Sequence, residues 1–297
     1  MSNIFITSAT GYIGEAVANA LLENGHTVSA LAYRDASAEK LEARGIKVYR
    51  GSLKDAATYK EALKLADVVI HTAAVNDTDF AQYDTLTVDT ILDALKGTNK
   101  TFIYTSGTWV LGDTGSILAD EKTPTNPIAL VAFRALNEQK VVQAAKDGIK
   151  SIVIRPTIVF GNGQGIVAQL INSAKESGES SYIGNGENHW SYIHVQDLAH
   201  LYVQAVKRGV AGAIYHASNG QSVNGRELAE LVAKAAQVET KRGLTSHEAR
   251  EKYGFLAEAY SLNQQIDSTL ARRELVWEPI IELTLETITN KKLAVVK

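Results

Sequence analysis

The first residues that could perform chemistry lie in a short turn near the N-terminus. Ser8, Gly11 and Gly14 form the pattern S-x-x-G-x-x-G between the apolar run 4–7 and the helix-forming run 15–23. Lacking a Cβ, Gly11 lets the backbone approach a diphosphate, and Gly14 lets a helix pack closely on the preceding strand. The helix N-terminus offers unpaired N–H groups to phosphate oxygens. The turn predicts a dinucleotide site, although Ser8 replaces the usual first glycine; a tight turn without nucleotide is the alternative.

The end of the second predicted strand, 27–33, indicates which dinucleotide fits. A ligand lies across the carboxyl ends of the strands in open α/β sheets. A carboxylate at this strand end would bind a ribose 2′-hydroxyl and repel a 2′-phosphate, but the residues here are Tyr33 and Arg34. Arg34 can pair with a phosphate, whereas Asp35 comes too late unless the turn brings it round. We therefore expect NADP in preference to NAD; the alternative is that Arg34 is a solvated surface charge.

The ends of the next two strands would contact the same cofactor. Ser52 and Leu53 follow the strand at 46–50, where an adenine edge would lie. Thr72, Ala73 and Ala74 follow the strand at 67–71. These small residues let the backbone pass beneath the cofactor, and ordinary helix–sheet packing is the alternative explanation for the alanines.

Apolar runs and helical patterns alternate along the first half of the chain. Strands are predicted at 27–33, 46–50, 67–71, 100–105 and 151–155, with helices at 15–23, 36–44, 80–96 and 127–147. This alternation predicts an α/β fold with a doubly wound parallel sheet of the Rossmann type. Beyond Pro156 the glycines cluster, with helices at 166–176, 195–207, 225–236 and 280–292 and a strand at 213–216 that returns to the sheet. We expect a dinucleotide-binding domain at 1–162 and a smaller, interwoven substrate lobe at 163–297.

Composition and charge exclude several functions. The 297 residues are 45% hydrophobic and 21% charged, as in soluble globular enzymes. A net charge of −3 disfavours nucleic acid as a partner, and the absence of cysteine excludes disulfides. No apolar run approaches the ~18 residues of a membrane span, and a strand begins too early for a secretory segment to precede it. We expect a cytoplasmic protein with a small-molecule substrate and no membrane partner. We expect no metal either, since His26, His71 and His200 lack ligand-like spacing with carboxylates.

Several segments of the chain share motifs with a known superfamily. They are 7–14, 71–74, 104–107, 155–161 and 189–198. Together they resemble the extended, or atypical, short-chain dehydrogenase/reductase superfamily, which includes NAD-dependent epimerases and dehydratases. The resemblance covers nearly the whole chain and implies an NAD(P)-dependent enzyme. It also implies that the cofactor contacts Thr7, Thr10, Gly11, Tyr12, Ile13, Gly14, Thr105, Arg134, Pro156 and Ile158.

The chemistry of that superfamily usually depends on a Tyr-x-x-x-Lys pair on the long helix. The tyrosine is a general acid or base, and the lysine lowers its pKa and holds the ribose. Aligned on 137–139, this chain has Leu130 at the tyrosine position and Arg134 at the lysine position. Arg134 can bind ribose hydroxyls but is a poor proton donor near neutral pH. The superfamily's serine or threonine after the fifth strand falls near 106–108, and counting back from Gly112 gives Gly107, so Ser106 or Thr108 would have to substitute for it.

Hydride transfer to a carbonyl also requires a proton at the carbonyl oxygen. The candidate donors in the second half of the chain are Tyr182, Tyr192, His189 and His194. His194 precedes a predicted helix near the usual substrate cleft, which makes it the catalytic candidate; a histidine that caps the helix is the alternative. Water is a further candidate. Trp109, Trp190 and Tyr192 either line the substrate pocket or pack in the core.

These residues support three hypotheses. The first is an NADP-dependent oxidoreductase of a small, fairly apolar carbonyl or alcohol, in which Arg134 binds the nicotinamide ribose and Ser106 orients the substrate oxygen. The second is an NAD(P)-dependent epimerase, dehydratase or isomerase, which would also need the missing tyrosine. The third is a nucleotide-binding sensor or interaction protein without turnover, which the loss of the Tyr-x-x-x-Lys pair supports. The protein is a monomer or a homodimer, because the apolar stripe with Leu136, Val141 and Val142 either forms a dimer interface, as in the superfamily, or is buried within the chain.

Overall fold

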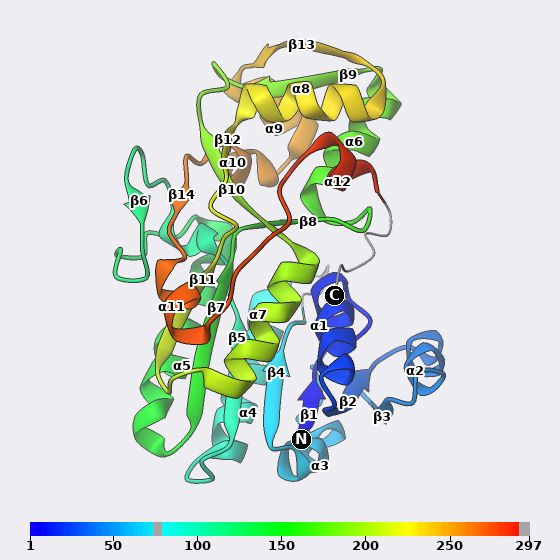
Figure 1. Ribbon diagram of the computed structural model, residues 1–297, viewed down its shortest axis with the longest axis vertical. Coiled ribbons are helices and arrows are strands. Elements are labelled where there is room, and N and C mark those ends of the chain that lie inside the picture. The colour runs from blue at the N-terminus through cyan, green and yellow to red at the C-terminus, as the bar shows by residue number, and fades with distance from the viewer. Residues whose placement is uncertain (74–78, 291–297) are drawn as a thin grey trace.

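A parallel sheet forms the centre of the computed structural model, which describes residues 1–73 and 79–290 (Figure 1). Within these residues the sheet has seven strands in the order β11-β7-β5-β4-β1-β2-β3. They are β1 (Asn3–Ile6), β2 (Thr27–Ala32), β3 (Lys47–Arg50), β4 (Val68–His71), β5 (Thr101–Thr105), β7 (Lys150–Pro156) and β11 (Ala213–Ala217). Every pair is parallel, and the order reverses between β1 and β4, as in doubly wound sheets. The predicted fold class is therefore confirmed.

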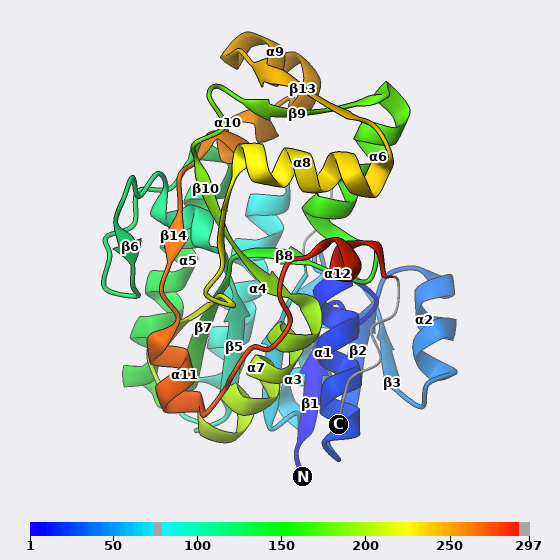
Figure 2. The same ribbon diagram turned by 45° about the horizontal axis from the view of Figure 1, so that its top comes forward.

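Smaller sheets and helices occupy the region above the central sheet in the view of Figure 1, and Figure 2 shows the same arrangement. Their strands are β6 (Leu118–Ala119), β8 (Ile158–Phe160), β9 (Glu179–Ile183), β10 (His189–His194), β12 (Ser222–Asn224), β13 (Glu239–Leu244) and β14 (Gln265–Ile266). Their helices are α6 (Gly165–Ser177), α8 (Gly225–Ala236), α9 (Ser246–Tyr253), α10 (Leu256–Ser261) and α12 (Leu285–Thr289). The division into domains at residue 162 remains a prediction.

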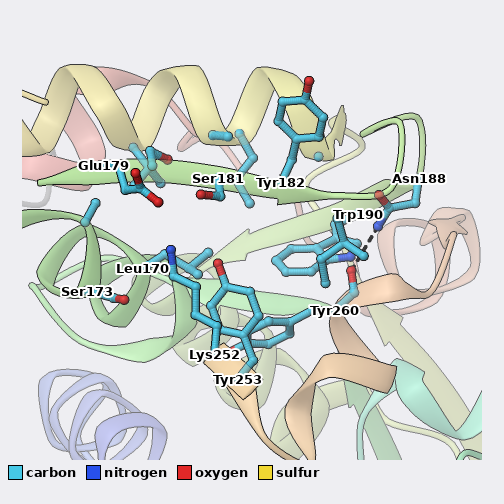
Figure 3. A pocket seen from close by; sticks show the side chains of 17 residues that line it. Leu170, Ser173, Glu179, Ser181, Tyr182, Asn188, Trp190, Lys252, Tyr253 and Tyr260 are labelled. Carbon is cyan, nitrogen blue, oxygen red and sulfur yellow. Dashed lines mark hydrogen bonds between the residues drawn. The ribbon is translucent and has the colours of Figure 1, made fainter. Parts of the chain in front are cut away.

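A small hollow lies within this region, between α6, α8 and β9 (Figure 3). The ring of Tyr260 lies 5.4 Å from that of Trp190 and 5.2 Å from that of Tyr253. The free volume is only about 40 Å³, whereas ligand pockets typically measure roughly 300 Å³ or more. The hollow is therefore too tightly packed to hold a substrate without opening.

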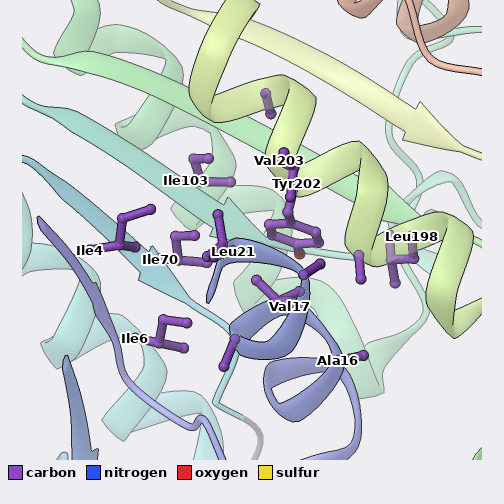
Figure 4. Packing of buried hydrophobic residues seen from close by; sticks show 14 of the residues in the cluster. Ile4, Ile6, Ala16, Val17, Leu21, Ile70, Ile103, Leu198, Tyr202 and Val203 are labelled. Atoms are coloured by element: carbon purple, nitrogen blue, oxygen red, sulfur yellow. The ribbon is translucent and has the colours of Figure 1, made fainter. Parts of the chain in front are cut away.

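Alternate residues of the central strands face opposite sides of the sheet, and each side has its own helices. Ile4 and Ile6 of β1 pack with α1 (Tyr12–Glu23) and α7 (Val195–Arg208), as Figure 4 shows. Phe5 of β1 points to the other face, against α3 (Lys60–Leu65), α4 (Phe80–Leu95) and α5 (Ala132–Gln143). Both faces are buried, which explains the continuous apolar runs of these strands. The two layers hold the carboxyl ends of the strands, where a ligand would bind, in fixed positions.

Helix α2 (Asp35–Glu42) and helix α11 (Thr269–Leu275) lie on the same side of the sheet as α1 and α7. Leu41 and Leu275 pack in the core of that layer. On the other face of the sheet, the apolar stripe predicted on the long helix is only partly buried. Val141 is buried against the sheet, whereas Leu136 is 62% exposed. Intrachain burial thus accounts for only part of the stripe.

Two predicted helices differ from those in the structure. The helix expected at 127–147 is α-helical only at Ala132–Gln143, with 3₁₀ turns at Ala129–Val131 and Ala144–Asp147. The helix expected at 280–292 is wrong over its first turn, because the described part is helical only in α12. Thr284 is the N-cap of α12, and its hydroxyl oxygen accepts from the Thr287 N–H at 3.2 Å, which sets the start of this helix. In the preceding segment, the N–H groups of Ile280 and Ile281 donate to the Asp197 carboxylate at 3.1 and 2.9 Å.

Candidate functional site

The glycine turn between β1 and α1 is closed by tight backbone contacts. A Cβ added to Gly14 would lie 1.8 Å from the Ser8 carbonyl oxygen and 2.8 Å from Thr72 Oγ1. A Cβ added to Gly11 would lie 2.8 Å from Ser8 Oγ. Gly14 therefore allows helix α1 to approach the turn, and Gly11 leaves room for the serine that replaces the first glycine of the usual motif.

A first cleft of about 490 Å³ lies at the carboxyl ends of β1, β2 and β3. This volume is within the range of ligand sites. The predicted cofactor residues that line it are Thr7, Thr10, Gly11, Tyr33, Arg34, Ser52, Leu53 and Ala73. Residues from four separate parts of the sequence thus meet around one space that can accommodate the adenosine and diphosphate half of a dinucleotide.

A site for a ribose 2′-hydroxyl would have an acidic side chain at the end of β2, whereas the charged residue that lines the cleft here is an arginine. Arg34 lines the first cleft, and its guanidinium has no hydrogen bond or ion pair within residues 1–73 and 79–290. The carboxylate of Asp35 forms an ion pair with Arg50 at the end of β3. The acidic residue is therefore paired at the surface, while the Arg34 guanidinium beside the cleft stays available to an anion.

A second cleft, of about 370 Å³, opens beside the first half of α5. Its walls are largely apolar, with Phe80, Trp109 and Phe133 among them. The predicted cofactor residues Tyr12, Ile13, Arg134, Pro156 and Ile158 line this cleft rather than the first one. Leu130 lines it too, so the position of the superfamily's tyrosine faces the cleft without a proton donor.

Arg134 is held at the wall of the second cleft by several contacts. One guanidinium N–H donates to the Thr105 carbonyl oxygen at 2.5 Å. The guanidinium also lies 5.4 Å from the ring centre of Phe80 and 5.5 Å from that of Phe133, where cation–π attraction applies. Thr105 itself lines neither cleft, and its contribution is this carbonyl contact. The side chain at the lysine position of the superfamily is thus fixed while the rest of its fork remains available.

Ser106 and Thr108 follow β5 and line the second cleft. The Ser106 Oγ is buried and has no hydrogen-bond partner in the described part of the chain. A buried hydroxyl without a partner is costly, so a ligand atom that accepts its hydrogen bond would be favoured there. Ser106 therefore lies where a substrate oxygen could be oriented.

Tyr12, the first residue of α1, extends toward the loop after β8. Its hydroxyl donates to the Gly161 carbonyl oxygen at 3.0 Å. Burial raises the pKa of Tyr12, so the phenol remains protonated at neutral pH. The ring lines the second cleft, and the space above Gly11 in the first cleft is not filled by it.

His194 lies apart from both clefts. Its ring is fully buried, and Nδ1 accepts from the Gln196 N–H at 3.2 Å, which caps α7. Burial lowers the pKa of His194 to about 4, so the imidazole is neutral. This geometry favours the capping role that the sequence left open. Of the other candidate donors, Tyr182 borders the small hollow of Figure 3, and His189 and Tyr192 border neither the hollow nor the two clefts.

Two further predicted cofactor residues, Gly14 and Thr72, do not line either cleft. Gly14 lies beneath the turn, and Thr72 Oγ1 is buried near it without a hydrogen-bond partner among the described residues. Ala74 lies outside the described residues. The two tryptophans predicted either to line the substrate pocket or to pack in the core lie in different places. Trp109 lines the second cleft, whereas Trp190 borders the small hollow.

A buried polar cluster next to the turn escaped sequence reasoning. Asp84 of α4 is fully buried and accepts hydrogen bonds from the Tyr104 hydroxyl at 2.7 Å and the Asn137 amide at 2.8 Å. His71 Nε2 lies 3.2 Å from the same carboxylate, and His71 Nδ1 lies 2.8 Å from Thr7 Oγ1. The available signal was a carboxylate on the apolar face of α4, in register with buried Val88 and Ile91.

No group of three or more His, Cys, Asp or Glu side chains suited to a metal ion occurs in the described ranges. Nor does any helix of those ranges have the length and apolar character needed to span a bilayer.

A glycine turn beside two clefts along the carboxyl edge of a Rossmann sheet is the arrangement of a dinucleotide-binding protein. The chain belongs to the NAD dependent epimerase/dehydratase family, whose model matches residues 4–219. It is thus an NAD(P)-dependent, oxidoreductase-type enzyme of the extended short-chain dehydrogenase/reductase superfamily, as the resemblance implied.

Relatives with curated descriptions extend over most of the chain. An uncharacterised protein of Schizosaccharomyces pombe is 35% identical over 93% of this chain and 94% of its own length. The 4-hydroxy-2-methyl-3-oxo-4-farnesyl-3,4-dihydroquinoline-1-oxide ketoreductase of Stigmatella aurantiaca is 27% identical over 86% of this chain and 79% of its own. Among solved structures, the dTDP-glucose 4,6-dehydratase of Bacillus anthracis in complex with NAD has a TM-score of 0.79 at 17% identity, covering 97% of this chain and 94% of that one. The structural likeness establishes the fold.

Proposed function

We propose that this enzyme is an NADP-dependent reductase or dehydrogenase of a small, fairly apolar carbonyl or alcohol. The observation that carries the proposal is the second cleft, where apolar and aromatic walls surround Ser106 and Arg134. Such a cleft favours a neutral, apolar substrate over a sugar nucleotide, whose phosphates would need several cationic partners. The Stigmatella aurantiaca relative is a ketoreductase whose named substrate carries a farnesyl group, which supports the same interpretation.

In a carbonyl reduction, each polar side chain of the second cleft would have a different role. A bound nicotinamide dinucleotide would supply or accept the hydride. Arg134 holds a ribose hydroxyl through the N–H groups that Thr105 does not occupy. The Ser106 hydroxyl donates to the substrate oxygen and stabilises the negative charge that develops there. Because Leu130 cannot give a proton, water is the source of the proton in this proposal.

The choice of NADP rests on the charges beside the first cleft. The 2′-phosphate of NADP would pair with Arg34, which has no partner within the described ranges. Asp35 would repel that phosphate, and its ion pair with Arg50 at the surface weakens this repulsion. A cytoplasmic location and a monomeric or homodimeric state belong to the same proposal.

Arg34→Ala is expected to weaken NADPH binding by about tenfold and to leave NADH binding unchanged, since only NADPH carries the phosphate. Titration of each reduced cofactor, followed by its fluorescence, measures both affinities. Arg44→Ala is the matched control, because Arg44 is a second arginine near α2 that is paired with Glu15 and lies outside the cleft. An equal loss for both cofactors would contradict the assignment of Arg34 to the 2′-phosphate.

Ser106→Ala is expected to lower kcat by about a hundredfold, which is the usual effect of removing one donor to a developing oxyanion. The affinity for NADPH should stay near the wild-type value, because Ser106 is assigned to the substrate. Stopped-flow measurement of NADPH oxidation separates the two quantities. Thr108→Val provides the comparison on the same wall of the cleft, with a smaller expected effect. Wild-type kinetics in Ser106→Ala would remove this residue from the mechanism.

The second candidate function is an epimerase, dehydratase or isomerase, and membership of the family favours it. These reactions regenerate the cofactor, so product forms without net NADPH oxidation. Incubating the enzyme with a panel of aldehydes and ketones, with NADPH consumption and products followed together, distinguishes the two functions. Oxidation of NADPH by an apolar ketone supports the reductase. Absence of binding to both NADPH and NADH would overturn both candidates.

A further inference from the structure

The carboxylate of Asp84 is the centre of a hydrogen-bond chain that begins at the phosphate turn. The Thr72 N–H donates to Thr7 Oγ1 at 3.3 Å, so the Thr7 hydroxyl proton is free to point to His71 Nδ1, 2.8 Å away. The His71 proton then lies on Nε2 and is donated to Asp84 Oδ1. Every donor in this chain has an acceptor, which fixes both the imidazole tautomer and the Thr7 rotamer.

The other carboxylate oxygen connects to the opposite side of the site. Asp84 Oδ2 accepts from the Tyr104 hydroxyl of β5 and from the Asn137 amide of α5. Asn137 lies about one helical turn beyond Arg134 on α5. The cluster is fully buried, with exposures of 0% for Asp84 and 1% for both His71 and Asn137. One carboxylate thus joins the ends of β1, β4 and β5 to the helix that carries Arg134.

The electrostatic environment keeps this carboxylate ionised. Burial raises the pKa of Asp84, but the hydrogen bond from His71, the charge of Arg134 and the hydrogen bond from Tyr104 outweigh that effect, so its pKa lies below the usual value. An ionised carboxylate accepts at both oxygens and donates at neither. Asp84 can therefore satisfy His71, Tyr104 and Asn137 at the same time, which a neutral amide at this position could not do.

We infer that Asp84 is a positioning residue that holds the phosphate turn and helix α5 at a fixed separation, so that one dinucleotide can occupy both clefts. The inference rests on the proposed function, because it requires a cofactor that reaches from Thr7 in the first cleft to Arg134 in the second. The surface pair of Lys140 and Asp89 also joins α4 to α5, at 2.6 Å, but it makes no contact with the turn. The Asp84 chain, in contrast, continues to Thr7.

Asp84→Asn tests the inference, because the amide retains the shape of the side chain and loses an acceptor. Its NH₂ group would face the Tyr104 hydroxyl and the Asn137 NH₂ group, which both donate to the carboxylate in the wild type. We expect the folded variant to bind NADPH about tenfold more weakly than the wild type. Asp89→Asn is the matched control on the same helix and should bind NADPH with wild-type affinity. Circular dichroism at the assay temperature verifies that each variant is folded.

The exchange Asp84→Asn/Asn137→Asp returns a carboxylate to the cluster. In the double variant, the amide oxygen at position 84 accepts from His71, and the amide NH₂ donates to the new carboxylate at position 137. We expect recovery of at least part of the NADPH affinity, and this variant decides the question if Asp84→Asn does not fold. A merely structural role predicts a lower unfolding temperature with unchanged affinity of the folded protein.

Thr7→Val breaks the same chain at the turn and completes a double-mutant cycle. If the hydrogen-bond chain from Thr7 to Asp84 acts as one unit, either substitution alone already breaks it. Thr7→Val/Asp84→Asn should then bind NADPH no more weakly than the weaker-binding single variant. If the double variant loses NADPH affinity by the product of the two single losses, the positioning role is overturned. Wild-type affinity in folded Asp84→Asn would also overturn it, and neither result would affect the proposed function. A wild-type protein that binds neither NADPH nor NADH would instead overturn the proposed function as well.

Discussion

Arg134→Ala is expected to weaken NADPH binding by ten- to a hundredfold, about the value of one charge-assisted hydrogen bond or two. Arg134 is the only residue for which the sequence predicts both a catalytic and a cofactor-binding role. Its guanidinium is held by the Thr105 carbonyl oxygen and by the rings of Phe80 and Phe133. A side chain fixed in this way loses little entropy when it binds a ribose, so its removal should affect affinity strongly.

Two comparisons make the Arg134 prediction specific. Arg134→Lys keeps the charge and loses the planar fork, so we expect an affinity between those of the wild type and the alanine variant. Lys140→Ala removes a cation from the exposed side of the same helix, where it pairs with Asp89, and should leave binding unchanged. Isothermal titration with NADPH measures all of these affinities. Equal affinities for Arg134→Ala and the wild type would reject the role and leave the second cleft without a cofactor contact of this kind.

The sheet could be predicted from the sequence because its strands are buried on both faces. Runs such as 67–71 and 151–155 are largely apolar, and the glycines and helical patterns between them leave few other arrangements. The helix expected at 280–292 begins only at Leu285, after the N-cap Thr284, because the capping pair of Thr284 and Thr287 was not weighed against the apolar residues before it. The contact of Ile280 and Ile281 with Asp197, which lies far away in the sequence, could not be predicted from any local pattern.

The candidate site was only partly accessible to the same reasoning. Residues that follow strand ends, such as Arg34 and Ser106, could be predicted to lie beside a cleft because a parallel sheet brings its carboxyl ends to one edge. The Asp84 cluster was missed because its partners come from separate elements and each has an ordinary explanation alone; His71, for example, lacks ligand-like spacing. For His194, the sequence allowed two roles and could not choose between them. Its position before a predicted helix fitted a catalytic or a capping role equally well, and only burial distinguishes them.

Gly14→Ala is expected to have the largest effect on stability, a loss of about 3 kcal/mol in the free energy of unfolding, the upper end for overpacking. The added Cβ would lie 1.8 Å from the Ser8 carbonyl oxygen. A backbone carbonyl cannot turn away without moving the whole turn, so α1 would have to separate from β1. We also expect NADPH binding to be lost at concentrations that saturate the wild type. Urea unfolding without cofactor and NADPH titration measure the two effects.

Gly11→Ala provides the comparison, because the clash there is with a side chain. The added Cβ would lie 2.8 Å from Ser8 Oγ, and removing that hydroxyl relieves the contact. Ser8→Ala/Gly11→Ala should therefore unfold at nearly the same urea concentration as Ser8→Ala, whereas Ser8→Ala/Gly14→Ala should stay as unstable as Gly14→Ala alone. If the first double variant is stable and still binds NADPH poorly, the methyl group at position 11 is keeping the diphosphate away from the backbone. A stable Gly14→Ala with wild-type affinity would contradict the close helix–turn packing on which the dinucleotide site depends.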